Sequence, residues 1–133
     1  MENRIFEYKM TIRESHLDTF GHVNNATYLQ IYEEARWEFI TENGYGLDKI
    51  KKTGLGPVIL EMHIKFMQEL RLRENIIIYS RTMDYSSKVG NIRQWITNGK
   101  GDVCSEIEMK IGLFDTKNRK LVKPTEEWLL AIK

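Results

Sequence analysis

The sequence predicts an α+β domain in which one long helix packs against an antiparallel sheet. Apolar residues alternate with polar residues over 6–13, recur with helical spacing over 25–43, and alternate again through most of 58–114. The connections between the later alternating segments are short, so neighbouring strands should run antiparallel. A length of 133 residues is close to the commonest domain size, and we expect one domain over residues 1–133.

The first expected strand spans residues 6–13 and is half-buried. Its apolar face carries Phe6, Tyr8, Met10 and Ile12. Glu7, Lys9 and the two other polar residues of this segment alternate with them and should face solvent.

The helix expected over residues 25–43 is the clearest element in the sequence. An apolar stripe runs along it at spacings of 4, 3 and 4, formed by Tyr28, Tyr32, Ala35 and Phe39. Asn24 or Asn25 can cap its first turn, and Asn43-Gly44 can supply the left-handed residue that ends it. The helix should contain about 17 residues and extend roughly 25 Å.

Four further strands follow a glycine-rich connection over residues 44–57. They are expected at 58–66, 76–83, 90–97 and 103–114, separated by polar turn residues. The last strand should bury one alternating set of side chains: Val103, Ser105, Ile107, Met109, Ile111 and Leu113. Pro124 and Thr125 can open a short terminal helix whose apolar residues are Trp128, Leu129 and Ile132.

Composition excludes several functional classes. The formal net charge is +1, which gives no overall field to attract nucleic acid or an anionic membrane. No apolar run approaches the roughly 18 to 20 residues of a membrane span. The single cysteine, Cys104, and the absence of a secretory signal at the N-terminus favour a cytoplasmic protein. The three histidines lack the spacing and cysteine partners of a zinc site, so we expect no metal.

The segment from Asp18 to Tyr28 fits neither periodic pattern and lies where the long helix begins. Free backbone N–H groups and the positive end of the helix dipole stabilise negative charge at such a position. They would stabilise the oxyanion that forms during acyl transfer in the same way. Gly21 allows a tight turn or the close approach of a substrate. The residues alone leave a plain polar loop with asparagine caps as an equal alternative.

The same segment resembles a known family. Asp18-x-x-Gly-His-Val-Asn-Asn-x-x-Tyr28, followed by Tyr32-Glu-Glu-Ala-Arg36, is similar to the hotdog-fold acyl-CoA thioesterases related to 4-hydroxybenzoyl-CoA thioesterase. The resemblance implies a long central helix wrapped by an antiparallel sheet of about five to six strands. It also implies a homodimer or homotetramer. The family's catalytic aspartate corresponds to Asp18, and its oxyanion-binding backbone N–H corresponds to that of Asn25.

The resemblance implies hydrolysis of an acyl-CoA thioester to a carboxylic acid and CoA. Asp18 would act as general base towards water or attack the carbonyl directly as nucleophile, and both routes stay open. The leaving thiolate is stable, since a free thiol has a pKa of about 8.5, so a strong general acid is less necessary. No cofactor is expected, because CoA is part of the substrate. We expect the substrate to contact the remaining motif residues: Gly21, His22, Val23, Asn24 and Tyr28.

Coenzyme A carries phosphates, which calls for cations near its nucleotide. Lys88 and Arg93, around the Gly90-Asn91 turn into a strand, are the sequence candidates for binding them.

Two other functional classes are compatible with this fold. A hotdog hydratase or dehydratase acting on acyl thioesters would need a histidine and a carboxylate placed to move protons, and the order Asp18-Gly21-His22 does not resemble that arrangement. A non-catalytic acyl-thioester-binding protein would need no ionised aspartate at the helix start. The sequence leaves open the length of the acyl group, and whether the carrier is coenzyme A or acyl-carrier protein.

Overall fold

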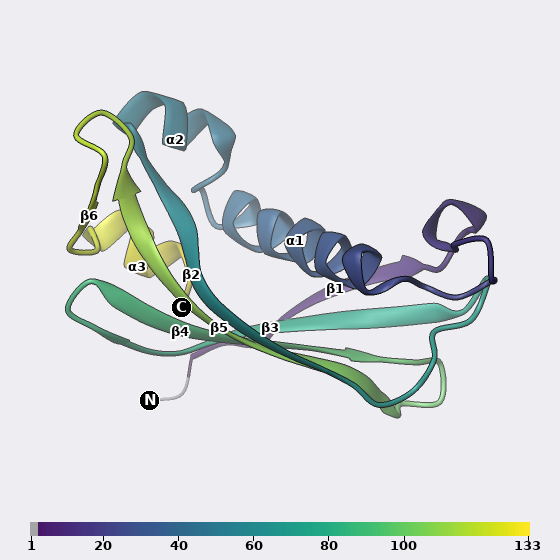
Figure 1. Ribbon diagram of the computed structural model, residues 1–133. Helices are drawn as coiled ribbons and strands as arrows, with labels where there is room; N and C mark the ends of the chain where they lie inside the picture. Colours follow the sequence, from purple (N-terminus) through teal and green to yellow (C-terminus); the bar gives the residue numbers. More distant parts are fainter. Residues whose placement is uncertain (1–2) are drawn as a thin grey trace.

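The structure, a computed structural model that describes residues 3–133, confirms the expected α+β class. A six-stranded antiparallel sheet curves beneath one long helix, α1 (Asn25–Glu42), which lies across its concave face (Figure 1). Five strands run in the spatial order β1-β3-β4-β5-β2, and β6 pairs with β5 outside this order. The strand bounds are β1 Phe6–Thr11, β2 Leu55–Phe66, β3 Asn75–Ser86, β4 Val89–Thr97, β5 Val103–Asp115 and β6 Lys120–Val122.

The ends of α1 follow its local sequence. Asn24 is the N-cap, and its side chain accepts a hydrogen bond from the Ala26 N–H. At the other end Asn43 is the C-cap, and Gly44 follows with a φ of +88°, the left-handed conformation that glycine adopts without strain. The buried face carries Tyr28, Ile31, Tyr32, Ala35, Phe39 and Ile40, which contains the predicted stripe.

Three short helices complete the part of the chain that the structure describes. A 3₁₀ turn over Glu14–His16 follows β1, and α3 (Glu126–Ala131) is the predicted terminal helix, capped by the Thr125 side chain. The third, α2 (Leu47–Thr53), lies within the segment that we expected to be a glycine-rich connection. The expectation missed it because a seven-residue helix flanked by Gly46 and Gly54 is too short to show a period.

The strand faces alternate as predicted in β1, β3 and β4. Along most of β2 both faces are exposed, contrary to the expectation, and its register with β5 shifts between Ile59 and Glu61. The alternation is also reversed at the start of β5. There Cys104 is fully buried and Val103 is 37% exposed, the reverse of the expectation. The register between β4 and β5 shifts between Ile96 and Thr97, and this irregularity reverses the alternation at the first residues of β5. The short β6 was also not expected.

Polar side chains line part of the interface between α1 and the sheet, and Gln94 of β4 connects them. Its buried amide donates to the backbone carbonyl of Tyr32 at 3.0 Å and to the Ser80 hydroxyl at 2.9 Å. Its carbonyl accepts from the guanidinium of Arg36 at 2.9 Å. The Gln94 side chain therefore bonds to two consecutive turns of α1 and to the neighbouring strand.

We predict that Gln94→Leu lowers the free energy of unfolding by about 2–4 kcal/mol, because it leaves several buried polar groups without a partner. Urea unfolding followed by circular dichroism measures this loss. Gln30→Leu makes the same exchange on the exposed face of α1 and should change stability by less than about 0.5 kcal/mol. Equal losses in the two variants would contradict a connecting role for Gln94.

Candidate active site

The loop between the 3₁₀ turn and α1 is folded around Asp18. One carboxylate oxygen, Oδ1, accepts from the backbone N–H groups of Phe20 at 2.9 Å and His22 at 3.2 Å. The Asp18 N–H donates to the His22 carbonyl, and Leu17 and Val23 form an isolated antiparallel bridge. Asp18 is thus held by its own turn, and both side-chain bonds use the same oxygen.

Gly21 sits at the tip of this turn with a φ of +79°. Its N–H donates to the Asp18 carbonyl at 3.0 Å. An L side chain would be strained in this conformation, although no atom lies within 4 Å of the position that its Cβ would occupy. The sequence expectation of a tight turn at Gly21 is confirmed.

The capping hydrogen bonds in the first turn of α1 do not include the backbone N–H of Asn25. The Asn24 side chain accepts from the Ala26 N–H, and the Asn24 carbonyl accepts from the N–H groups of Thr27 and Tyr28. Asn25 is exposed and lines a cavity. An N–H at the positive end of the helix dipole is therefore available to a group in that cavity.

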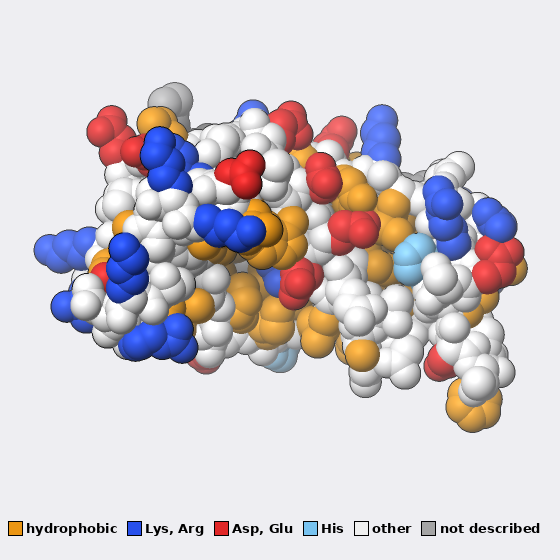
Figure 2. Space-filling model, turned by 90° about the horizontal axis from the view of Figure 1, so that it is seen from above, with side chains coloured by type: hydrophobic (Ala, Val, Ile, Leu, Met, Phe, Trp, Pro, Cys, Tyr) orange, Lys and Arg blue, Asp and Glu red, His pale blue; other side chains and the backbone are white. Residues whose placement is uncertain are grey.

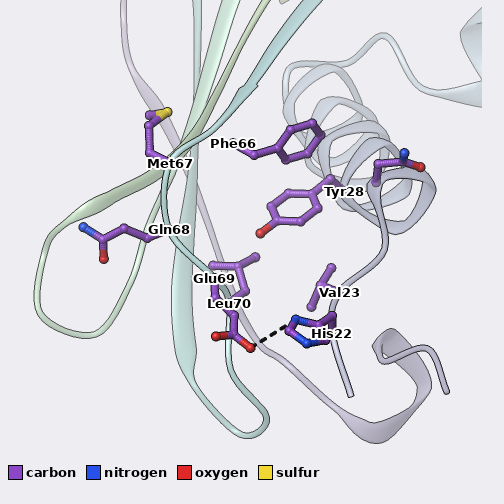
Figure 3. Close-up of a pocket in the computed structure, with 9 residues that line it drawn as sticks. His22, Val23, Tyr28, Phe66, Met67, Gln68, Glu69 and Leu70 are labelled. Carbon is purple, nitrogen blue, oxygen red and sulfur yellow. Dashed lines mark ion pairs between the residues drawn. The ribbon is translucent and has the colours of Figure 1, made fainter. Parts of the chain in front are cut away.

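This cavity has a volume of about 430 Å³ and lies between the start of α1 and the segment joining β2 to β3 (Figure 3). Four predicted site residues line it: His22, Val23, Asn25 and Tyr28. Asp18, Gly21 and Asn24 belong to the turn and the cap that hold those four in place.

The other wall of the cavity was not predicted. It is formed by residues 66–70, which follow the end of β2: Phe66, Met67, Gln68, Glu69 and Leu70. Nothing in the sequence pattern marks them as site residues, because they meet the helix only through the fold. The only available signal was their position at the end of a long strand.

The two walls contact each other at two points. The rings of Tyr28 and Phe66 pack edge to face with centroids 4.9 Å apart. His22 Nδ1 lies 3.3 Å from Glu69 Oε1, and both side chains are at least half exposed (Figure 3). Burial raises the pKa of the Tyr28 hydroxyl above its ordinary value, so this group is neutral at physiological pH. The cavity thus has an apolar interior and a polar rim.

The two residues suggested for phosphate binding lie elsewhere in the chain. Lys88 is exposed in the turn between β3 and β4, at the far end of these strands from the cavity. Arg93 lies on β4, where it bonds to Glu106 at 2.9 Å and covers the ring of Trp95. Within one chain, neither residue lines the cavity beside Asn25.

Among the described residues no group of three or more His, Cys, Asp or Glu side chains could hold a metal ion. In the same part of the chain, no helix has the length and apolar character needed to cross a membrane.

Comparison with known proteins gives consistent results. The family model described as the thioesterase-like superfamily matches residues 12–132. The long-chain acyl-CoA thioesterase FadM of Escherichia coli is 29% identical over 113 residues, which cover 84% of this chain and 85% of FadM. The chloroplastic acyl-acyl carrier protein thioesterase ATL3 of Arabidopsis thaliana is 32% identical over 75 residues, covering 56% of this chain and 40% of the plant protein.

Solved structures share the fold. A hypothetical protein from Staphylococcus aureus in complex with CoA superposes with a TM-score of 0.90 at 20% identity, over 99% of this chain and 84% of that one. The probable thioesterase YbaW from Escherichia coli gives a TM-score of 0.84 at 25% identity, over 96% and 98% of the two chains. The hotdog fold implied by the sequence resemblance is confirmed.

The two hydrogen bonds that the turn donates to the Asp18 carboxylate lead to a prediction about stability. Asp18→Asn keeps an oxygen acceptor for the two backbone N–H groups, whereas Asp18→Ala removes it. We expect the alanine variant to be less stable than the asparagine variant by about 1–2 kcal/mol, measured by urea unfolding. Equal stabilities would show that these hydrogen bonds do not hold the turn.

Proposed function

The chain belongs to the thioesterase-like superfamily, a family of thioester hydrolases, and we propose that it is an acyl-CoA thioesterase. The observation that carries the proposal is a cavity lined on one side by the start of α1, with an available N–H at Asn25, and on the other by an apolar wall against Tyr28. The turn that holds Asp18 leads into His22 and Val23, which line the same cavity. The reaction would yield a free carboxylic acid and CoA.

In this mechanism the thioester carbonyl oxygen points at the Asn25 N–H. As a water oxygen attacks the carbonyl carbon, the Asp18 carboxylate takes the proton of that water. The carbonyl electron pair moves onto oxygen, and the Asn25 N–H and the helix dipole stabilise the resulting oxyanion. Collapse of the intermediate breaks the C–S bond and releases the thiolate of CoA. In the alternative route, Asp18 itself attacks the carbon and water then hydrolyses the anhydride.

The arrangement of Asp18 supports either route. Both hydrogen bonds from the turn go to Oδ1, so Oδ2 has no hydrogen bond within the turn, and in this proposal Oδ2 is the atom that acts on water or on the carbonyl carbon. The apolar side chains of Tyr28, Phe66 and Leu70 offer a surface for the hydrocarbon of the acyl group. We also propose that the substrate contacts the other motif residues: His22 and Val23 line the cavity, and Gly21 and Asn24 lie in the adjoining turn and helix cap.

A second candidate function rests on one observation. His22 and Glu69 form a histidine–carboxylate pair at the rim of the cavity, which a hydratase acting on enoyl thioesters would require. Loss of enoyl absorbance on incubation with an enoyl-CoA tests this function. Activity abolished by His22→Asn but retained by Asp18→Asn would favour the hydratase. A third class, a non-catalytic thioester binder, would bind acyl-CoA without turnover.

We also propose that the protein is a homodimer joined through β2. This strand is the last in the sheet order, so the edge that does not pair with β5 is open. Its exposed apolar side chains are Ile59, Leu60, Met62 and Phe66, and hydrophobic side chains gather along this edge in Figure 2. A long open edge of this kind pairs readily with another strand, and pairing with its own copy would extend the sheet. Two such dimers would form the alternative homotetramer.

Two further expectations from the sequence remain proposals. The reaction as written needs no cofactor, since the thioester, water and Asp18 supply all its atoms. The cytoplasmic location is also a proposal, and the relatives named above include a bacterial enzyme and a chloroplastic one.

Thiol release from a panel of short-chain, long-chain and aromatic acyl-CoAs tests the activity. We expect Asp18→Asn to lower kcat at least a hundredfold, because it removes the charge and keeps the turn. Its circular dichroism spectrum should match that of the wild type. A wild type that is inert on the panel, or a fully active Asp18→Asn variant, would contradict the mechanism.

Sedimentation analysis tests the dimer. Met62→Lys places a charge on the open edge of β2, and we expect it to convert the dimer to a monomer, since inward-facing charge opposes strand pairing. Met83→Lys is the matched control, because Met83 is similarly exposed but lies on β3, an interior strand. Dissociation of both variants, or of neither, would contradict an interface at β2.

A further inference from the structure

The turn between β4 and β5 contains an Asn-Gly pair. It comprises residues 98–102, Asn-Gly-Lys-Gly-Asp, and lies at the same end of the sheet as the connection from β2 to β3 (Figure 1). A glycine after an asparagine leaves the backbone nitrogen between them unshielded, because no Cβ lies beside it. The chain contains a second such pair, Asn43-Gly44, at the end of α1. The two pairs can therefore be compared within one molecule.

Deamidation at an Asn-Gly pair needs only water and hydroxide. Hydroxide takes the proton of the glycine N–H, and the nitrogen attacks the side-chain carbonyl carbon, Cγ, so that a C–N bond forms and the carbonyl electron pair moves onto Oδ1. Collapse of this intermediate breaks the bond from Cγ to Nδ2, which takes a proton from water and leaves as ammonia. Water then opens the cyclic imide by breaking one of its two C–N bonds, which gives aspartate or isoaspartate.

The β4–β5 turn stabilises the charge that develops on Oδ1 of Asn98. This oxygen accepts from the backbone N–H groups of Lys100 at 2.9 Å and Asp102 at 3.0 Å. Two N–H donors on one carbonyl oxygen polarise the carbonyl and stabilise an oxyanion. The bond to Lys100 closes a short ring of atoms that includes both Cγ and the Gly99 nitrogen. The two reacting atoms are thus held within one compact turn.

The nitrogen atoms that take part in the reaction are not held by other bonds. In the part of the chain that the structure describes, Nδ2 of Asn98 donates to no oxygen, and the Gly99 N–H donates to no backbone carbonyl. Residues 99–102 are exposed, so hydroxide can reach the Gly99 nitrogen. Neither proton removal nor the departure of ammonia therefore has to break a bond of the fold.

The pair at the end of α1 is held against the same reaction. Oδ1 of Asn43 accepts from the Arg4 guanidinium, and its Nδ2 donates to the Ala131 carbonyl at 2.7 Å. The Gly44 N–H donates to the Thr41 carbonyl at 3.0 Å. The ψ of Asn43 is 12°, so the Gly44 nitrogen eclipses the backbone nitrogen of Asn43 and is turned away from its Cβ. Ring closure here would require the end of α1 to unwind.

We infer that Asn98 is a site of spontaneous deamidation in the folded protein and that Asn43 is protected from it. The reaction involves only the chain and water. The inference therefore goes beyond the proposed thioesterase function and does not depend on it.

Deamidation of Asn98 affects the wall of the cavity. The N–H groups of Met67 and Gln68, which line the cavity, both donate to the carbonyl of Cys104, two residues beyond the turn. An aspartate keeps an oxygen for the two donors of the turn and adds one negative charge. An isoaspartate adds a carbon to the main chain and so alters the hydrogen bond from the Gly101 N–H to the carbonyl of residue 98. The hairpin, and the wall bonded to it, is then less firmly held.

Peptide mass spectrometry tests the site. The folded protein is incubated at mildly alkaline pH and digested with trypsin, which releases Asn43 in the peptide 37–49 and Asn98 in the peptide 94–100. Deamidation raises the mass of a peptide by one unit. We expect this form to accumulate at least about tenfold faster in 94–100, because only Asn98 has oxyanion donors and an unbonded nucleophile. Equal rates, or a faster rate in 37–49, would overturn the inference.

The same incubation in concentrated urea is the control for local sequence. Unfolding removes the surroundings of both pairs, so the two rates should converge. A preference for Asn98 that is as large in urea as in the folded protein would show that the structure does not cause it.

Gly99→Ala tests the attacking nitrogen. The new methyl group shields this nitrogen, and its carbon would lie 3.8 Å from the Asn75 carbonyl oxygen, the nearest atom, so the turn can accommodate it. We expect deamidation of Asn98 to slow at least about fivefold, while the rate at Asn43 stays at the wild-type value. A circular dichroism spectrum that matches the wild type shows that the fold is intact. An unchanged rate at Asn98 would reject attack by the backbone.

The identity of the product gives an independent test. An isoaspartate methyltransferase transfers a labelled methyl group to isoaspartate and not to ordinary aspartate. Attack by the Gly99 nitrogen gives both residues at position 98, whereas direct hydrolysis of the amide by water gives aspartate alone. Deamidated 94–100 that accepts no label would therefore overturn the inference. None of these measurements uses enzymatic activity, so their outcome is separate from that of the thioesterase proposal.

Discussion

The position of α1 on the sheet depends on one buried amide. The Gln94 side chain bonds to the Tyr32 carbonyl, the Ser80 hydroxyl and the Arg36 guanidinium, so a shift of the helix by one turn would break both of its bonds to α1. Apolar contacts alone tolerate small displacements, because they have no direction. A satisfied polar group in a low-dielectric interior is more specific, because every misplacement costs a hydrogen bond.

Because Gln94 fixes the position of α1, the residues at the N-terminus of this helix are fixed as well. Asn24 and Asn25 are held beside the segment that follows β2, residues 66–70. The cavity forms between this segment and the start of α1. The electrostatics of that place come from the backbone of α1 itself, so no cationic side chain is needed to polarise a carbonyl there. The turn around Asp18 adds a carboxylate whose position is set by backbone N–H groups. The proposed chemistry thus depends on the placement of one helix end.

The sequence was informative wherever the decisive interactions were local. The period of two over β3 and β4, the helical stripe of α1 and the cap at Asn24 all arise from neighbouring residues, and the structure contains each of them. The wall formed by residues 66–70 could not be predicted, because these residues meet His22 and Tyr28 only after the sheet has formed. The helix α2 was missed because seven residues are too few for a period, and the exposure of Val103 was missed because it depends on pairing between strands.

The turn around Asp18 has a consequence for how this chain can diverge. Its two backbone N–H donors need an oxygen acceptor, but they do not need a charge, and an asparagine side chain would satisfy them equally. A single-base change in an aspartate codon gives asparagine. Folding therefore exerts little selection on the charge at this position, and in the proposed mechanism only the reaction preserves it. Descendants that lose the carboxylate would keep the helix start and the cavity, so thioester-binding proteins without turnover are one mutational step away from this scaffold.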